Sequence, residues 1–106
     1  MAFTNPTGRY ASFGVVSSID PKIIDTIWDI LDNYLKNVFP LDDRIEVHFQ
    51  NRNGDGQLTI LFYQRFFKGP IAFDYNYPFD PYGPEQLLLI DEAGEESLIL
   101  PYELEI

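Results

Sequence analysis

The sequence contains no cysteine and a single histidine, and it has no Lys, Arg or His after Lys68. Without cysteine the chain forms neither a disulfide nor a thiolate metal site, and one histidine cannot build a multi-histidine centre. No apolar run is long enough to span a membrane, and residues 1–10 lack the charged start and apolar centre of a signal peptide. We therefore expect a cytoplasmic protein with no bound metal and no cofactor.

The missing bases leave the negative charge concentrated in the last third of the chain. Residues 69–106 hold nine acids and no base, whereas residues 1–68 hold eight acids and seven bases, so nearly all of the net charge of −10 follows Lys68. Phosphate contacts need Lys and Arg, so we expect no direct nucleic-acid ligand. An acidic surface instead favours a basic protein partner.

The segment Asp20–Phe39 is the one convincing helix. Asp20 is a favourable N-cap, and Pro21 suits the first helical position because its missing N–H is not needed there. At 100° per residue the apolar side chains fall on one side and the polar ones on the other, which predicts an amphipathic helix ending before Pro40. Because the apolar arc covers about half of the circumference, we expect this helix to lie across a sheet.

Two further segments predict a β-hairpin. Arg44–Asn51 alternates apolar and polar residues, as a half-buried strand does, and Asn53–Gly56 carries the residues that tight turns need. The returning segment, Leu58–Phe67, is apolar on both faces, and so is Leu87–Ile90 in the strand Gln86–Asp91. A strand that is buried on both faces lies inside a sheet rather than at its edge.

Glycine and proline mark the remaining strands. We expect a strand at Arg9–Val16, in which Gly14 marks a bulge or a close backbone approach. Ile71–Phe79 and Ser97–Leu104 contain Pro78 and Pro101, so each is an edge strand, a strand end or a bulged strand.

These elements predict a single α+β domain over residues 1–106, with residues 1–8 as a flexible lead-in. One long amphipathic helix packs on a five- to six-stranded, mainly antiparallel sheet. One helix covers only one face of a sheet, yet two strands are apolar on both faces. Either the sheet curls or a partner covers the other face, most simply a second copy in a homodimer.

Short motifs stand at both ends of the sequence: Arg9-Tyr10, Gly14-Val15, Ile19, Trp28, Leu31-Asp32, Ile90-Asp91, Ser97 to Leu100 and Tyr102-Glu103. These motifs resemble the DUF960 family, a group of small uncharacterised bacterial proteins found in Firmicutes and their mobile elements. The resemblance covers roughly the first 32 and the last 20 residues. It implies a bacterial, intracellular accessory protein and assigns no activity.

Catalytic and metal-binding patterns are weak. Asn51–Leu58 resembles the first half of an EF-hand loop, but the twelfth position is Phe62 and the flanks are strands, so a hairpin turn is favoured. His48 shares a strand face with Glu46, and a surface histidine is favoured there over a general base. No pair among the 17 acids stands out, so we predict a non-enzyme and no catalytic residue.

The most site-like stretch is Phe73–Tyr82, which interleaves aromatic residues with acids. Exposed tyrosines provide large contact areas at low entropic cost. In an edge strand, the same pattern turns aromatic side chains to the core and acids to water, and this structural alternative stays open. The candidate partner-binding residues are Asp74, Tyr75, Tyr77, Asp80, Tyr82, Asp91, Glu92, Glu95 and Glu96.

We therefore expect a protein-binding module whose acidic C-terminal third engages a basic partner. Its extreme form is a decoy that inhibits a nucleic-acid-binding protein, as an anti-CRISPR or anti-restriction protein does. The alternative is a homo-oligomeric structural or accessory protein without catalytic activity, in which the charge serves solubility. A carboxylate-dependent hydrolase is the minor alternative.

Overall fold

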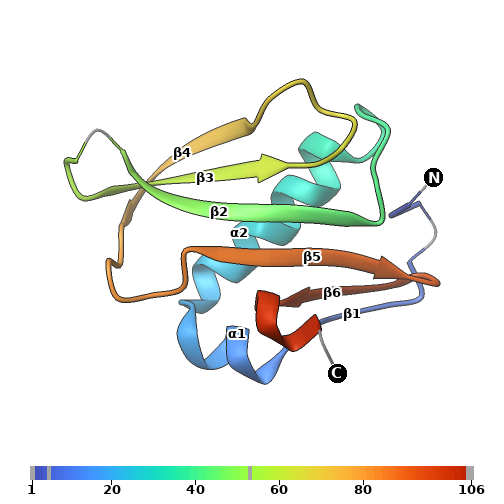
Figure 1. Ribbon diagram of the computed structural model, residues 1–106, viewed down its shortest axis with the longest axis horizontal. Coiled ribbons are helices and arrows are strands. Elements are labelled where there is room, and N and C mark those ends of the chain that lie inside the picture. Colours follow the sequence, from blue (N-terminus) through green and yellow to red (C-terminus); the bar gives the residue numbers. More distant parts are fainter. Residues whose placement is uncertain (1, 5, 53, 105–106) are drawn as a thin grey trace.

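The protein has an α+β fold in which the longest helix packs on one face of a six-stranded sheet, in a computed structural model that describes residues 2–4, 6–52 and 54–104 (Figure 1). The strands are β1 (Gly8–Ala11), β2 (Arg44–Arg52), β3 (Gln57–Tyr63), β4 (Ile71–Pro78), β5 (Gln86–Glu92) and β6 (Glu95–Ile99). Their order in the sheet is β1-β6-β5-β2-β3-β4. Only β1 and β6 pair in parallel, so the predicted α+β class and mainly antiparallel sheet are confirmed.

The prediction of a strand over Arg9–Val16 is wrong in its second half. Strand β1 ends at Ala11, and a short helix, α1 (Phe13–Ser18), follows. Ser12 begins this helix, because its hydroxyl accepts a hydrogen bond from Val15 N at 3.2 Å. Val15 is thereby turned into the core, where it is fully buried. A short apolar run fits a strand or a buried helix equally well, which explains the error.

The long helix is shorter and less regular than predicted. Helix α2 (Pro21–Ile30) continues as one π-helical stretch, η1 (Leu31–Leu35), and ends there rather than at Phe39. Asn37 has a φ of 66°, a left-handed conformation that asparagine adopts at helix ends. The helix therefore ends at Leu35, before this left-handed residue, and Pro40 follows only after the helix has ended. Within the part of the chain that the structure describes, no helix is long and apolar enough to cross a membrane.

The described part of the lead-in contacts the body at Phe3 and Thr7. Phe3 is 1% exposed and belongs to the core, and its N–H donates to Asp91 Oδ2 at 2.8 Å. Thr7 N donates to Gly94 O at 2.8 Å, just before β1 joins β6. Residues 1 and 5 lie outside the described residues. The core otherwise lies between α2 and the inner face of the sheet, around Ile27, Ile60 and Leu89.

The last predicted strand, Ser97–Leu104, ends at Ile99, and Pro101 begins the 3-10 helix η2 (Pro101–Leu104). Strand β6 is not at an edge, because β1 pairs with its other side. Gly14 is not a bulge but allows a close approach by this segment, since a Cβ there would lie 2.7 Å from Leu100 Cδ1. The other strand that contains a proline, β4, is an edge strand, which is one of the positions predicted from Pro78.

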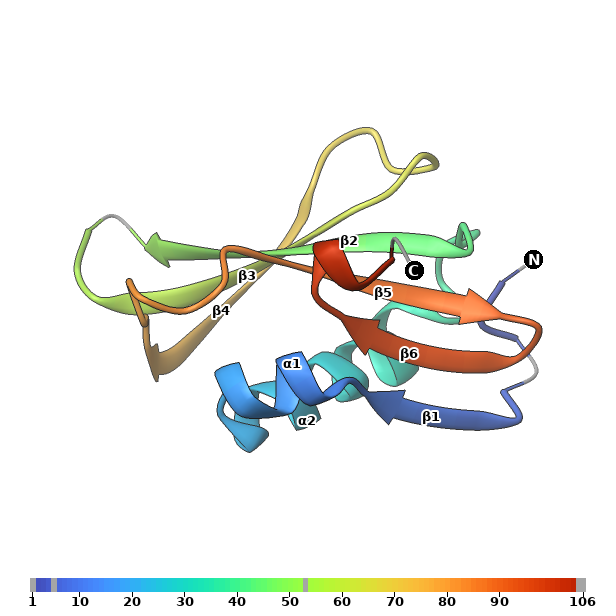
Figure 2. The same ribbon diagram turned by 60° about the horizontal axis from the view of Figure 1, so that its bottom comes forward.

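The outer face of the sheet is partly covered by the protein itself. Leu88 and Ile99 pair across β5 and β6 on the face away from α2, yet they are only 5% and 8% exposed. The sheet curls, and η2 turns back against β5 (Figure 2). The sequence left two ways to cover the outer face, a curled sheet or a partner. For Leu88 and Ile99, the curled sheet and η2 provide the cover.

Candidate binding site

A groove of about 410 Å³ opens at one end of the sheet, between the sheet and the start of α2. This volume lies within the range of about 300–1,000 Å³ that is typical of ligand sites. The walls are largely apolar, because Phe49 and Leu58 come from the ends of β2 and β3 and Ile23 comes from α2. The other lining residues are Ser18, Ile19, Asp20, Lys22, Tyr77, Pro78, Phe79, Asp80, Gly83 and Pro84.

Chain reversals position this groove. In an antiparallel sheet the end of β2, the start of β3 and the end of β4 meet at one end, and the β4–β5 loop closes that end (Figure 1). Phe79 N donates to Gly56 O at 2.8 Å, and Phe49 N donates to Glu85 O at 3.0 Å. These bonds join the hairpin and the loop on either side of the groove.

Four exposed carboxylates lie at or near the groove, and we call them the acidic rim: Asp20, Asp55, Asp80 and Glu85. Asp20 and Asp80 line the groove, whereas Asp55 and Glu85 are placed beside it by the two backbone bonds just described. Among the described lining residues, Lys22 carries the only positive charge. The site therefore combines apolar walls with a net negative entrance.

Local hydrogen bonds hold three of the rim carboxylates in place. Asp20 Oδ1 accepts from Lys22 N at 2.8 Å, which confirms Asp20 as the N-cap of α2. Asp80 Oδ1 accepts from Tyr82 N at 2.9 Å, and Asp55 Oδ1 accepts from Gln57 N at 3.0 Å. Each bond uses one carboxylate oxygen, so the other remains available to a ligand.

Five of the nine predicted partner-binding residues lie near this groove. Tyr77 and Asp80 line it, and Tyr82 in the β4–β5 loop is 96% exposed. Tyr75 stacks on Tyr77 with ring centroids 5.5 Å apart, and burial raises the pKa of Tyr75, with Asp29 adding to the shift. Asp74 accepts from Thr59 Oγ1 at 2.6 Å and lies 3.7 Å from Arg52 Nη1, so it already has partners within the sheet.

The other four predicted residues lie at the opposite end of β5, so the nine do not form one surface. Glu92 and Glu95 flank the tight β5–β6 turn and are exposed. Asp91 holds that turn, because Asp91 Oδ1 accepts from Gly94 N at 2.9 Å. Glu96 is fully buried, contrary to the prediction that it contacts a partner.

Glu96 belongs to an internal ion-pair network instead. Arg9 Nη2 donates to Glu96 Oε1 at 2.6 Å, and Lys36 Nζ donates to Glu96 Oε2 at 2.7 Å. Arg9 also donates to both oxygens of Asp32 and lies 4.4 Å from the centroid of the Trp28 ring. These contacts hold the pKa of Arg9 above its usual value and that of Asp32 below its usual value. The network fastens α2 and η1 to β1 and β6.

The remaining sequence candidates lie in the β2–β3 hairpin and on the outer face of β2. Asn51–Leu58 forms the β2–β3 hairpin, in which Asn51 Oδ1 accepts from Gly56 N at 2.8 Å, so its oxygen holds the turn. Asn53 lies outside the described residues. Across the described residues, no group of three or more acids or histidines could hold a metal ion. His48 Nε2 lies 3.1 Å from Glu46 Oε1 on the outer sheet face, as expected from their shared strand face.

The model of a family described as staphylococcal proteins of unknown function, DUF960, matches residues 8–103. The chain belongs to the DUF960 family. The resemblance seen at the two ends therefore extends through the middle of the chain. This DUF960 protein is also similar to a protein of unknown function from Enterococcus faecalis, known from a crystal structure. The two are 35% identical with a TM-score of 0.84, over 91% of this chain and 89% of that chain. No curated protein matches this DUF960 chain.

Sequence reasoning missed three rim residues of this DUF960 protein. The sequence identifies Asp20 as an N-cap and Asp55 as part of a turn that resembles half of an EF-hand loop, and it includes Glu85 only as one acid of the C-terminal third. The signal that could have found them is topological. Two consecutive antiparallel connections bring the hairpin turn after β2 and the loop after β4 to the same end of the sheet.

Proposed function

We propose that the protein is a non-catalytic protein-binding module whose acid-rimmed groove engages a basic segment of a protein partner. The observation that carries this proposal is the acidic rim around apolar walls. Apolar walls favour burial of a large side chain, and charges at the entrance select the partner and speed its approach.

The charge of the groove end supports a basic partner. Asp20, Asp55, Asp80 and Glu85 are all exposed, and the lining includes a single base, Lys22. Carboxylates without a cationic partner repel one another, and a bound Lys or Arg relieves that repulsion. The acidic surface that we propose therefore differs from the one expected from the sequence, since it omits Glu96 and includes Asp20 and Asp55.

Nucleic-acid-binding proteins carry basic segments of this kind, because Lys and Arg contact phosphates. A decoy that covers such a segment is the form of this function that we favour. The homo-oligomeric alternative is favoured by a separate observation, an exposed basic loop between β3 and β4 at the far end of the molecule.

The test is affinity capture from bacterial lysate at low and high salt with three forms of the protein. The rim variant carries Asp55→Asn, Asp80→Asn and Glu85→Gln, which remove three charges and keep the accepting oxygens of Asp55 and Asp80. The control variant carries Asp43→Asn, Glu92→Gln and Glu95→Gln, which remove three exposed charges at the opposite end of β5.

We expect the wild type and the control variant to retain the same basic partner at low salt and to lose it at high salt, since exposed charges are screened by ions. The rim variant should lose the partner at both salt concentrations. Equal capture by all three forms, or capture of nothing by the wild type, would contradict the proposal.

A further inference from the structure

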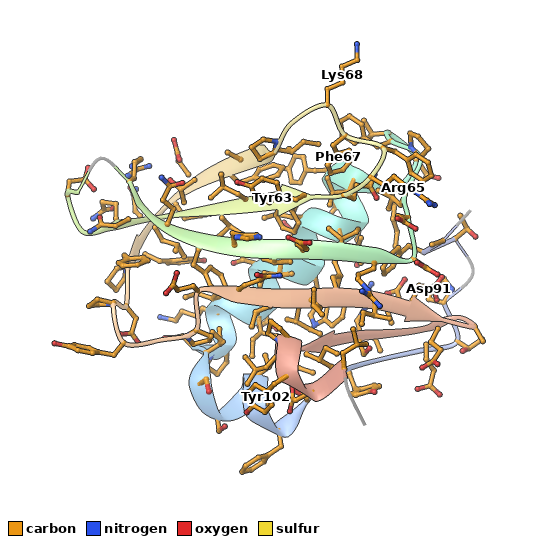
Figure 3. The ribbon with its side chains drawn as sticks, viewed as in Figure 1. Tyr63, Arg65, Phe67, Lys68, Asp91 and Tyr102 are labelled. Carbon is orange, nitrogen blue, oxygen red and sulfur yellow. The ribbon has the colours of Figure 1, made fainter. Side chains whose placement is uncertain are left out.

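The loop between β3 and β4, residues 64–70, is basic and aromatic in an otherwise acidic molecule. Phe66 is 50% exposed, the Arg65 side chain is 70% exposed, and Lys68 is also exposed. Figure 3 shows Lys68 pointing away from the body at the tip of this loop. Arg65 Cζ lies 4.9 Å from the centroid of the Phe66 ring, so a positive charge accompanies the exposed ring.

The base of the loop is fixed, which preorganises its tip. Gln64 Nε2 donates to Pro40 O at 2.7 Å, and Gln64 Oε1 accepts from Asp42 N at 2.7 Å. Phe67 packs edge-on against Phe39 with ring centroids 5.2 Å apart. A fixed loop loses less conformational entropy on binding than a mobile one.

The loop and the groove lie at opposite ends of β3. Leu58 lines the groove, and Tyr63, which lies five positions later in the chain, precedes the loop. At about 3.4 Å per residue, this separation is about 17 Å, and the loop points further away. One copy therefore cannot place its own loop in its own groove.

We propose that the groove binds the β3–β4 loop of a second copy of this chain, with Phe66 between the apolar walls and Arg65 and Lys68 at the acidic rim. This inference rests on the proposed function of the groove and names its occupant. The arrangement pairs an apolar ring with apolar walls and brings Lys68, which makes no ion pair among the described residues, to the acidic rim. Arg65 Nε lies 3.4 Å from Asp42 Oδ2 of its own copy, so Arg65 would exchange or share that contact.

Charge complementarity favours this loop over two other exposed aromatic residues, Tyr82 and Tyr10. Tyr82 is 96% exposed, but it lies beside Asp80 of the rim. Tyr10 is 52% exposed and follows Arg9, but Asp32 and Glu96 already neutralise that arginine. Phe66 combines an exposed ring with a lysine that makes no ion pair among the described residues.

The contact is heterologous, because a loop on one copy meets a groove on the next. Such contacts form rings when the rotation between copies closes and open chains when it does not. Each copy carries a net charge of −10, so copies repel at long range. At physiological ionic strength the screening length is about 8 Å, which weakens that repulsion more than the direct contacts at the rim.

The experiment is analytical ultracentrifugation at physiological ionic strength on the full chain and two variants. The loop variant carries Phe66→Ser and Lys68→Gln, and the groove variant is the rim variant defined above. We expect the wild type to associate with rising concentration. Each variant alone should associate at least about tenfold more weakly than the wild type, which corresponds to a loss of about 1.4 kcal/mol or more in binding free energy.

The decisive sample is an equal mixture of the two variants. The groove variant keeps an intact loop and the loop variant keeps an intact groove, so the mixture should form a dimer and stop there. The control variant defined above should associate like the wild type, and circular dichroism should show that every variant is folded.

Two outcomes would overturn the inference. Variants that associate as strongly as the wild type would show an interface elsewhere, such as pairing of two β4 edges. A monomeric wild type would exclude the second copy, and capture of a lysate partner that still depends on the rim would then leave the proposed function standing. If lysate capture also ignored the rim, both proposals would fail.

Discussion

Acidic residues have opposite surroundings in two end regions of the sheet. Near the β5–β6 turn, at the end opposite the groove, Glu96 is buried and bonded to Arg9 and Lys36, so its charge is paired within the molecule. At the groove end, Asp55 and Glu85 are exposed and make no ion pair among the described residues. One end holds the fold together, and the other carries unpaired negative charge, where we propose that a partner binds.

This difference shows that counting charges along a sequence does not locate a binding surface. Nine acids follow Lys68, yet Glu96 is paired with Arg9 and Lys36, and Asp74 lies 3.7 Å from Arg52 Nη1. These three bases come from the first half of the chain. Which acids keep an unpaired charge is therefore set by the fold and not by their order in the chain.

The largest expected effect is the loss of stability when Glu96 is removed from the ion-pair network. Glu96→Ala removes the fully buried carboxylate and leaves Arg9 and Lys36 with Asp32 as their remaining acidic partner among the described residues. Removing one member of a buried ion pair destabilises a protein by about 3 kcal/mol or more. We expect a matching loss in the free energy of unfolding, measured by urea denaturation.

Glu95→Ala is the matched control, because Glu95 is the adjacent acid and is exposed. Its effect should stay within about 0.5 kcal/mol. Equal losses for the two variants would show that Glu96 contributes no more than a surface charge.

The next effect tests the close packing of the C-terminal segment against α1. Gly14→Ala places a methyl group 2.7 Å from Leu100 Cδ1 and 2.8 Å from Glu103 Oε2. Overpacking of this kind costs about 1–3 kcal/mol. The Glu103 side chain also anchors the segment, since it accepts from Leu100 N at 2.7 Å and from the Ser12 hydroxyl.

Gly8→Ala is the control for backbone effects, because a Cβ at Gly8 meets no atom within 4 Å. Thermal unfolding should show a lower Tm for Gly14→Ala and a nearly unchanged Tm for Gly8→Ala. A more stable Gly14→Ala variant would mean that Leu100 and Glu103 move aside freely.

Much of the fold was predictable because local patterns and tertiary packing agree. The alternation in β2, the Asp20 cap of α2 and the edge position of β4 all follow from single residues or short periods. The errors fall where two elements fit one pattern. The apolar run around Val15 suits a strand or a helix, and Asn37 ends the helix through a left-handed conformation that its sequence context barely signals.

The candidate site was less predictable, because it is built from residues distant in sequence. Asp20, Asp55 and Asp80 come from three separate connections that meet only when the sheet forms. Tyr77 and Asp80 were predicted from their local aromatic and acidic pattern. Glu96 was misplaced because its partner Arg9 lies 87 residues earlier in the chain.

The smallest expected effect is the pH-dependent stability that the Arg9–Asp32 ion pair contributes. Arg9 hydrogen-bonds to Asp32 and holds its pKa below the usual value of 3.8, so ionised Asp32 stabilises the folded state. This stabilisation is fully present above the unfolded pKa and is lost as pH falls through the lower, folded pKa. Asp32→Asn should cost about 1 kcal/mol or less at neutral pH, because the Asp32 side chain is 40% exposed.

Urea midpoints from neutral pH to about pH 3 should show the gap between wild type and Asp32→Asn closing below about pH 4. Asp25→Asn is the matched control, because Asp25 is an exposed carboxylate on α2 with no ion pair among the described residues. It should show no gap that closes in acid. A gap for Asp32→Asn that stays constant over the whole range would mean that the asparagine disturbs packing and that the Arg9 contact contributes nothing through charge.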